Sequence, residues 1–142
     1  MTDVKRIYGE HLKAMLRNDP EEAQRWHDQL PDGSLEGTGR INIAVLSLVL
    51  KKRFSENKSH DAILAFVADF MNSLQGSGQQ VNPLHAELLV RSVLGESALF
   101  AEVPGEVANL LMPLLAVLAA DQSRLDAEDV NELVEKAIQK AA

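Results

Sequence analysis

Histidine is the residue in this chain that most readily performs chemistry, because its ring titrates near neutral pH and binds metal ions. The sequence contains four histidines: His11, His27, His60 and His85. Metal sites in helical proteins use spacings such as His-Glu-x-x-His or Glu-x-x-His, and neither occurs here. We therefore predict no metal ligands. We interpret His11 and His27 as half-buried side chains hydrogen-bonded to backbone carbonyls.

Other catalytic signatures are also missing. The chain has no cysteine, which excludes disulfides, thiolate metal sites and cysteine nucleophiles. No Gly-x-Ser-x-Gly elbow is present, and the glycines at positions 33, 37 and 39 match neither a phosphate-binding loop nor a dinucleotide fingerprint. We predict no catalytic residue and no cofactor. An enzyme remains an alternative only if the fold itself brings histidines and carboxylates together.

The charge pattern excludes several classes of partner. The formal net charge of −7 disfavours nucleic-acid binding, which needs a concentrated basic surface. The basic cluster at 51–53, with Lys58, is interpreted as a solvated helix end.

The apolar run at 110–120 is shorter than the roughly 20 residues that span a bilayer, so no membrane association is expected. Residues 1–6 lack the apolar core of a signal peptide, and we expect a cytoplasmic protein.

The spacing of apolar residues predicts a helix for nearly every segment that could position these side chains. Residues 41–50 could form a buried strand or a buried helix, and we favour the helix because no second strand candidate exists. Lys13 is expected to face away from the interior, whereas Trp26 and His27 are expected to face inward. Residues 31–40 are predicted to form a loop. The expected helices are 2–18, 20–30, 41–54, 59–75, 83–94, 96–101, 104–120 and 126–141, with Asp19, Ser59, Asn82 and Asp126 as caps.

The chain is expected to be organised around residues 110–120, which contain no polar side chain. A helix that is apolar all round belongs in an interior. We predict a single all-α domain over residues 1–142, a compact bundle of six to eight helices around a buried apolar helix near residues 104–120. The low aromatic content, 4%, favours helix packing over a β-sandwich. Pro113 lies inside this helix and has no N–H to give to the carbonyl of Asn109.

Two functions fit this architecture. The first is a non-enzymatic interaction or regulatory module that binds another protein, including a second copy of itself. The second is a sensor or carrier of a small apolar ligand, with a pocket near the Pro113 irregularity. The side chains proposed for the ligand site or interface are His11, Trp26, His27, Phe66, Phe70, Met71, Met112 and Pro113.

Overall fold

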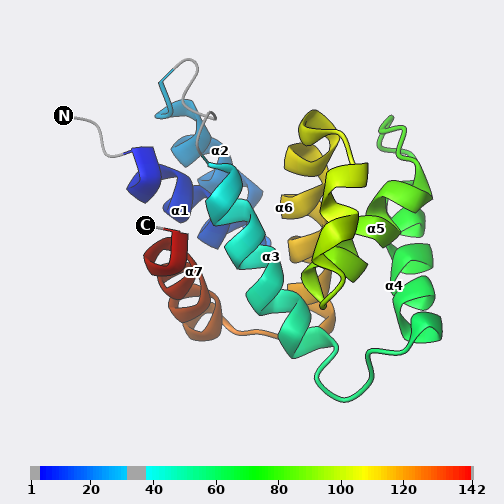
Figure 1. The fold of residues 1–142 in the computed structure, drawn as a ribbon. Coiled ribbons are helices and arrows are strands. Elements are labelled where there is room, and N and C mark those ends of the chain that lie inside the picture. The colour runs from blue at the N-terminus through cyan, green and yellow to red at the C-terminus, as the bar shows by residue number, and fades with distance from the viewer. Residues whose placement is uncertain (1–3, 32–37, 142) are drawn as a thin grey trace.

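The protein is all-α in its computed structural model, which describes residues 4–31 and 38–141 (Figure 1). Over these residues there is no strand, and residues 41–53 are helical as predicted. Helix α3 begins at Gly39, so the predicted loop is too long at its end; residues 32–37 lie outside the described part. The elements are α1 (Val4–Leu16), α2 (Pro20–Asp28), α3 (Gly39–Arg53), α4 (His60–Ser73), α5 (Pro83–Val93), η1 (Ser97–Glu102), α6 (Gly105–Gln122) and α7 (Ala127–Ala141).

Side chains of the predicted capping residues begin four of these helices. Asp19 accepts a hydrogen bond from the backbone N–H of Glu22, and Ser59 and Asn82 do the same for α4 and α5. Asp126 accepts from the N–H of Asp129 at 2.8 Å and begins α7. Such caps satisfy N–H groups that have no partner within the helix. The positions of these helix starts were therefore readable from the sequence.

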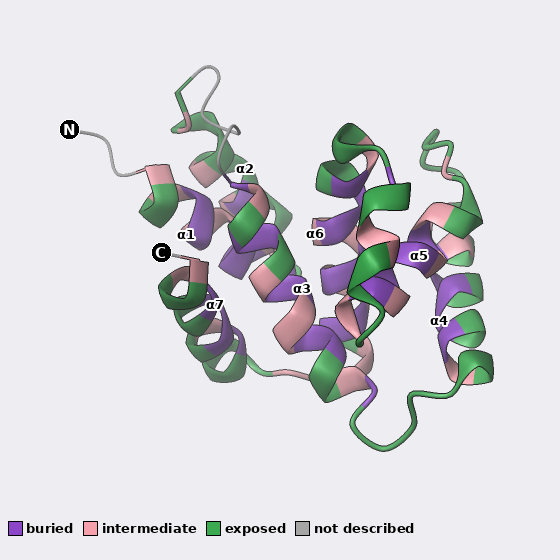
Figure 2. Ribbon diagram, viewed as in Figure 1, coloured by how far each residue is buried: buried purple, intermediate pink, exposed green. Residues whose placement is uncertain are grey.

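Helix α6 shares the centre of the bundle with α3, which packs on α6, α7 and α5, so the prediction of a single central helix holds only in part. Helix α6 packs against α3, α1 and α5, while α7 packs on α3 and α1, and α4 packs on α5. Figure 1 shows α4 and α5 on the opposite side of the molecule from α1, α2 and α7. Buried residues recur along one side of outer helices such as α4 and α7 (Figure 2). The largest side chains in the interior include Leu46, Leu50, Leu111 and Leu115.

One stripe of α6 is not covered by its neighbours. Leu110 is 48% exposed, and Leu114 and Val117 are only half-buried. Spacings of four and three residues place these side chains on one face of the helix. In the described part of the chain, no helix is long and apolar enough to cross a membrane. The open stripe of α6 is therefore the first feature to examine for binding.

Two expectations about α1 and α2 were wrong. Lys13 is buried, not outward, because α7 packs on this side of α1 and Glu135 pairs with the Lys13 ammonium group, together with Glu10. Burial lowers the pKa of Lys13, but the hydrogen bonds to the two carboxylates outweigh it and raise the pKa. Helix α2 buries only Ala23, and His27 is exposed, so the prediction that His27 is half-buried and faces inward is wrong; Trp26 is half-buried.

Candidate functional site

Two adjoining hollows lie beside Pro113, between the α1–α2 hairpin and α6. Their volumes are about 600 Å³ and about 270 Å³, and they share four lining residues. We call them together the apolar groove. Its principal side chains are His11, Met15, Ala23, His27, Leu114 and Val117.

The groove exists because α2 packs against α1 and leaves one face of α6 uncovered. Asn18 adopts a positive φ of 59°, which reverses the chain after α1. Asp19 and Pro20 then start α2, whose one buried residue, Ala23, packs on α1. Met15 of α1 and the open stripe of α6, at Leu114 and Val117, provide the apolar lining.

His11 is fixed by a hydrogen bond across the hairpin. Its Nδ1 lies 2.8 Å from the backbone oxygen of Ala23, so Nδ1–H donates to that carbonyl. The predicted half-buried, carbonyl-bonded histidine is confirmed at this position. Burial lowers the pKa of His11, and the charge of His27 lowers it further against the opposing effect of the Ala23 bond. His11 is therefore neutral near pH 7, with Nε2 as a hydrogen-bond acceptor.

His27 meets His11 at the groove although the two lie on different helices. Their ring centroids are 5.4 Å apart, with the planes tilted by 54°. The ring centroid of Tyr8 lies 5.8 Å from that of His11. Among the residues that the structure describes, no group of three or more histidine and acidic side chains could hold a metal ion. The paired rings thus provide polar atoms for hydrogen bonding.

The end of the groove nearest α3 is closed by a buried polar contact. The Tyr8 hydroxyl donates to Oδ1 of Asn42 at 2.7 Å and also hydrogen-bonds to Thr38. Burial raises the pKa of Tyr8, against the opposing effect of these two bonds, so the hydroxyl stays protonated. Asn109 and Pro113 line the same end. Because Pro113 has no N–H, the Asn109 carbonyl lacks its usual helical donor.

The groove carries little charge. None of the described residues lining either hollow is a lysine or an arginine, and Asp19 is the one carboxylate among them. One oxygen of Asp19 accepts from the Glu22 N–H as the cap of α2. The lining therefore offers neutral hydrogen-bonding groups, among them the amides of Asn18, Gln24 and Gln79, but no lysine or arginine.

The sequence-predicted site residues divide between the groove and other places. His11, His27 and Pro113 line the groove. Phe66, Phe70 and Met112 are buried in the core, and Met71 packs against it. Trp26 donates from Nε1 to Glu22 within α2 at 3.4 Å. Sequence reasoning missed Met15, Leu114 and Val117 as groove residues, because helical spacing does not tell which apolar face its neighbours leave open.

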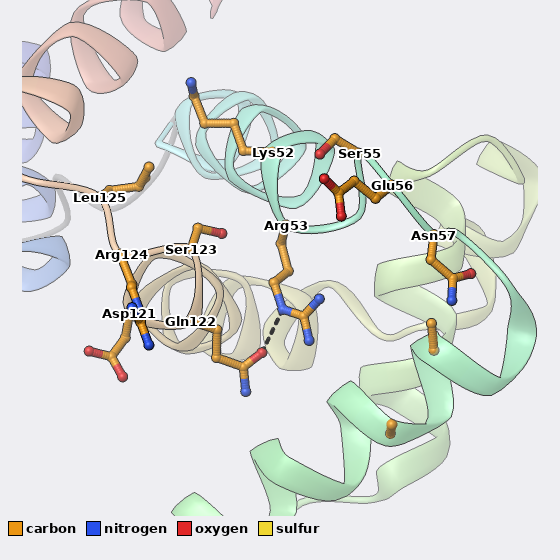
Figure 3. A pocket seen from close by; sticks show the side chains of 12 residues that line it. Lys52, Arg53, Ser55, Glu56, Asn57, Asp121, Gln122, Ser123, Arg124 and Leu125 are labelled. Atoms are coloured by element: carbon orange, nitrogen blue, oxygen red, sulfur yellow. Dashed lines mark hydrogen bonds between the residues drawn. The ribbon is translucent and has the colours of Figure 1, made fainter.

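A separate hollow, of about 970 Å³, lies where α3, α4 and α6 meet (Figure 3). We call it the polar basin, and its side chains include Lys52, Arg53, Glu56, Asp121, Gln122 and Arg124. Arg53 Nε donates to Gln122 at 2.7 Å, and Gln122 donates to Asp69 at 3.1 Å. The Arg53 guanidinium also covers the ring of Phe54, 5.0 Å from its centroid.

Most of the basin's polar character follows from the helix ends that meet there. Lys52 and Arg53 belong to the last turn of α3, and Arg124 follows the end of α6. Cations at helix C-termini compensate the negative end of the helix dipole. The hydroxyl of Ser123 is the one buried side-chain polar atom in the described residues without a hydrogen-bond partner. A lone hydroxyl beside an otherwise bonded network does not make a binding site.

No match to this chain was found among protein families, curated proteins or solved structures. The groove itself is therefore the basis for the functional argument.

Proposed function

We propose that this protein binds a small, mainly apolar molecule in the apolar groove. The observation that carries the proposal is the open stripe of α6, in which Leu114 and Val117 face a hollow of about 600 Å³. Small-molecule sites have volumes of roughly 300–1,000 Å³, with apolar walls and a few polar groups that orient the ligand. Histidine rings and neutral hydrogen-bonding groups beside Leu114 fit that description.

Covering this surface contributes a favourable apolar term to binding. Each 100 Å² of apolar surface removed from water contributes about 2.5 kcal/mol. That amount corresponds to a factor of about 70 in the dissociation constant before the cost of immobilising the ligand. A molecule the size of a substituted benzene ring, lying on Met15, Leu114 and Val117, would cover an area of this order on both partners.

An interaction module that binds a protein or a second copy of this chain stays a separate proposal. Besides Leu110, the large exposed apolar side chains within residues 4–31 and 38–141 are Ile43, Leu64 and Leu84, which lie on three other helices. Apolar side chains distributed singly are ordinary surface features and point to no single partner face.

We also propose the cytoplasm as the compartment, on the cysteine-free sequence alone.

A thermal-shift screen with alkylbenzenes, alkylphenols and medium-chain lipids tests the ligand proposal. A ligand that binds only the folded protein raises Tm. We expect at least one aromatic probe to raise the Tm of the wild type and of Leu84→Gln, whose side chain is 53% exposed on α5 outside the groove lining. The same probe should shift Leu114→Gln much less.

Two results would contradict the proposal. The absence of any shift across the screen would remove the case for an apolar ligand. An equal shift in Leu114→Gln and Leu84→Gln would mean that the probe binds elsewhere than in the groove.

A further inference from the structure

The polar atoms of the apolar groove define the ligand more narrowly than its shape does. With Nδ1 committed to the Ala23 carbonyl, His11 has Nε2 left, an acceptor on a side chain that lines both hollows. Asn109 lines the end of the groove, and its carbonyl has no helical donor because Pro113, four residues later, has no N–H. Asp19 uses one carboxylate oxygen for the cap, and its second oxygen remains an acceptor. The side-chain amides of Asn18, Gln24 and Gln79 both donate and accept, so the groove's fixed acceptor on its apolar wall is Nε2 of His11.

When a bound ligand shields a hydrogen-bond acceptor of the groove from water, the ligand must supply a donor to that acceptor. A buried acceptor without a partner costs about 1–3 kcal/mol, so a pure hydrocarbon covering these atoms would lose much of its apolar gain. A ligand with a hydroxyl or N–H group avoids that loss by donating to His11. The exposed ring of His27, 5.4 Å away between centroids, can complete the contact to a hydroxyl from the other side.

The same lining disfavours an anionic head group. No lysine or arginine is among the described residues that line the groove, while Asp19 adds a negative charge. An ionised carboxylate moved out of water needs a countercharge or several donors. With no lysine or arginine to pair with its carboxylate, a fatty acid should therefore bind less tightly than an uncharged donor with the same apolar body.

We propose that the ligand is an uncharged hydrogen-bond donor with an apolar body, such as an alcohol, a phenol or an N–H heterocycle, with His11 Nε2 as its acceptor. This inference rests on the proposed function, since it assigns the chemistry of the molecule that occupies the groove. It distinguishes three ligand classes that share one apolar body and differ only in the head group.

Three para-substituted butylbenzenes test it at pH 7.5: 4-butylphenol, 4-butylanisole and 4-butylbenzoate. Calorimetric titration of the full chain should give the tightest binding for the phenol, about fivefold weaker binding for the anisole, which cannot donate, and weaker binding still for the anionic benzoate. The ratio of the phenol and anisole dissociation constants is the decisive quantity.

His11→Phe provides the matched variant, because it keeps an aromatic ring and removes the acceptor. The phenol-to-anisole preference should fall to about one in His11→Phe and persist in Leu84→Gln. Both probes meet the same folded population of each variant, so a change in stability does not alter the ratio.

Each other result overturns the inference in a recognisable way. Equal binding of phenol and anisole to the wild type leaves apolar-ligand binding in place but refutes the donor requirement. Tightest binding of the benzoate refutes the exclusion of anions. A preference that survives in His11→Phe shows that His11 is not the acceptor. Failure of all three probes to bind contradicts the proposed function itself, and the inference falls with it.

Discussion

The apolar groove and the polar basin differ in how well their lining side chains hydrogen-bond to water. The basin is the larger hollow, about 970 Å³ against about 600 Å³ for the main part of the groove. In the basin, Arg53 donates to Gln122 (Figure 3), and Gln122 donates to Asp69. The charged side chains of Lys52, Glu56 and Asp121 around them are exposed to water. In the groove, water meets Met15, Leu114 and Val117, to which it cannot bond. The size of a hollow therefore says less about binding than the chemistry of its lining.

The two hollows arise from different packing. At the basin, the ends of α3 and α6 meet the side of α4, and Phe54 and Phe66 fill the space beneath with rings 5.5 Å apart at 78°. At the groove, the short helix α2 contacts α1 but leaves α6 partly open. Substitutions at the basin floor should therefore affect folding, whereas substitutions in the groove should affect binding.

The largest expected effect is the loss of stability in Phe66→Ala. Phe66 is fully buried beneath the basin, and removing its ring leaves a cavity that the surrounding helices fill only in part. We expect the free energy of unfolding to fall by about 3–5 kcal/mol, measured by urea denaturation followed by circular dichroism. Leu110→Ala, at a groove residue that is 48% exposed, should cost less than about 1 kcal/mol. A similar cost for both substitutions would remove the distinction between the two regions.

The next effect is on binding. Leu114→Lys places an ammonium group on the groove wall, and we expect it to weaken 4-butylphenol binding at least about 30-fold, since roughly 2 kcal/mol of apolar contact is lost. Arg53→Met in the basin should leave that dissociation constant within about twofold. Calorimetric titration of both variants measures the difference. If Arg53→Met weakened binding more than Leu114→Lys, the ligand would lie in the basin.

Much of the fold could be predicted because its signals are local. Asp19, Ser59 and Asn82 start helices through their own side chains, and a proline follows two of them in the first turn. The apolar spacing of residues 41–50 fitted either a strand or a helix. The helix was predicted because no other segment could serve as a partner strand, and the structure confirms it. Local signals of this kind need no knowledge of how the helices pack.

The groove depends on packing, which the sequence does not encode locally. Residues 110–120 are all apolar, so their pattern cannot show which stripe stays open. Lys13 pairs with Glu135, 122 positions away, and nothing near either residue marks the pair. His11 and His27 were recognised as candidates, but their contact depends on the angle at which α2 returns along α1. Sequence reasoning therefore found part of the site and missed its apolar wall.

A smaller effect should come from Pro113→Ala. Alanine restores the N–H that the Asn109 carbonyl lacks and removes the clash of the proline ring, while the unfolded chain regains conformational freedom. We expect a net gain of about 1 kcal/mol in the free energy of unfolding. Pro83→Ala is the matched control, because a proline in the first turn of α5 costs no helical hydrogen bond and should yield no gain. A loss of stability in Pro113→Ala would show that the surrounding helices require the proline geometry.

The smallest effect is the contribution of His11 to the pH dependence of stability. Burial lowers the pKa of His11 in the folded state, so the unfolded chain takes up this proton at a higher pH than the folded protein does. The free energy of unfolding should therefore fall as the pH drops from above the pKa of His11 in the unfolded chain, near 6.5, through its lower pKa in the folded protein. At pH 8 both states are deprotonated, and His11 causes no loss of stability. The groups around His11 are Tyr8 on α1, Asp19 before α2 and His27 on α2; α6 adds no titratable side chain to the described lining.

Urea denaturation of the wild type and of His11→Phe at intervals from pH 8 to pH 5 isolates this contribution. The variant should lose less stability than the wild type over that range, whereas Leu84→Gln, which changes no titratable group, should follow the wild-type slope. A steeper fall in His11→Phe would mean that the folded protein binds the His11 proton more tightly than the unfolded chain does. His11 would then be a cation in the groove at mildly acidic pH, and an anionic ligand would become the better match for the lining.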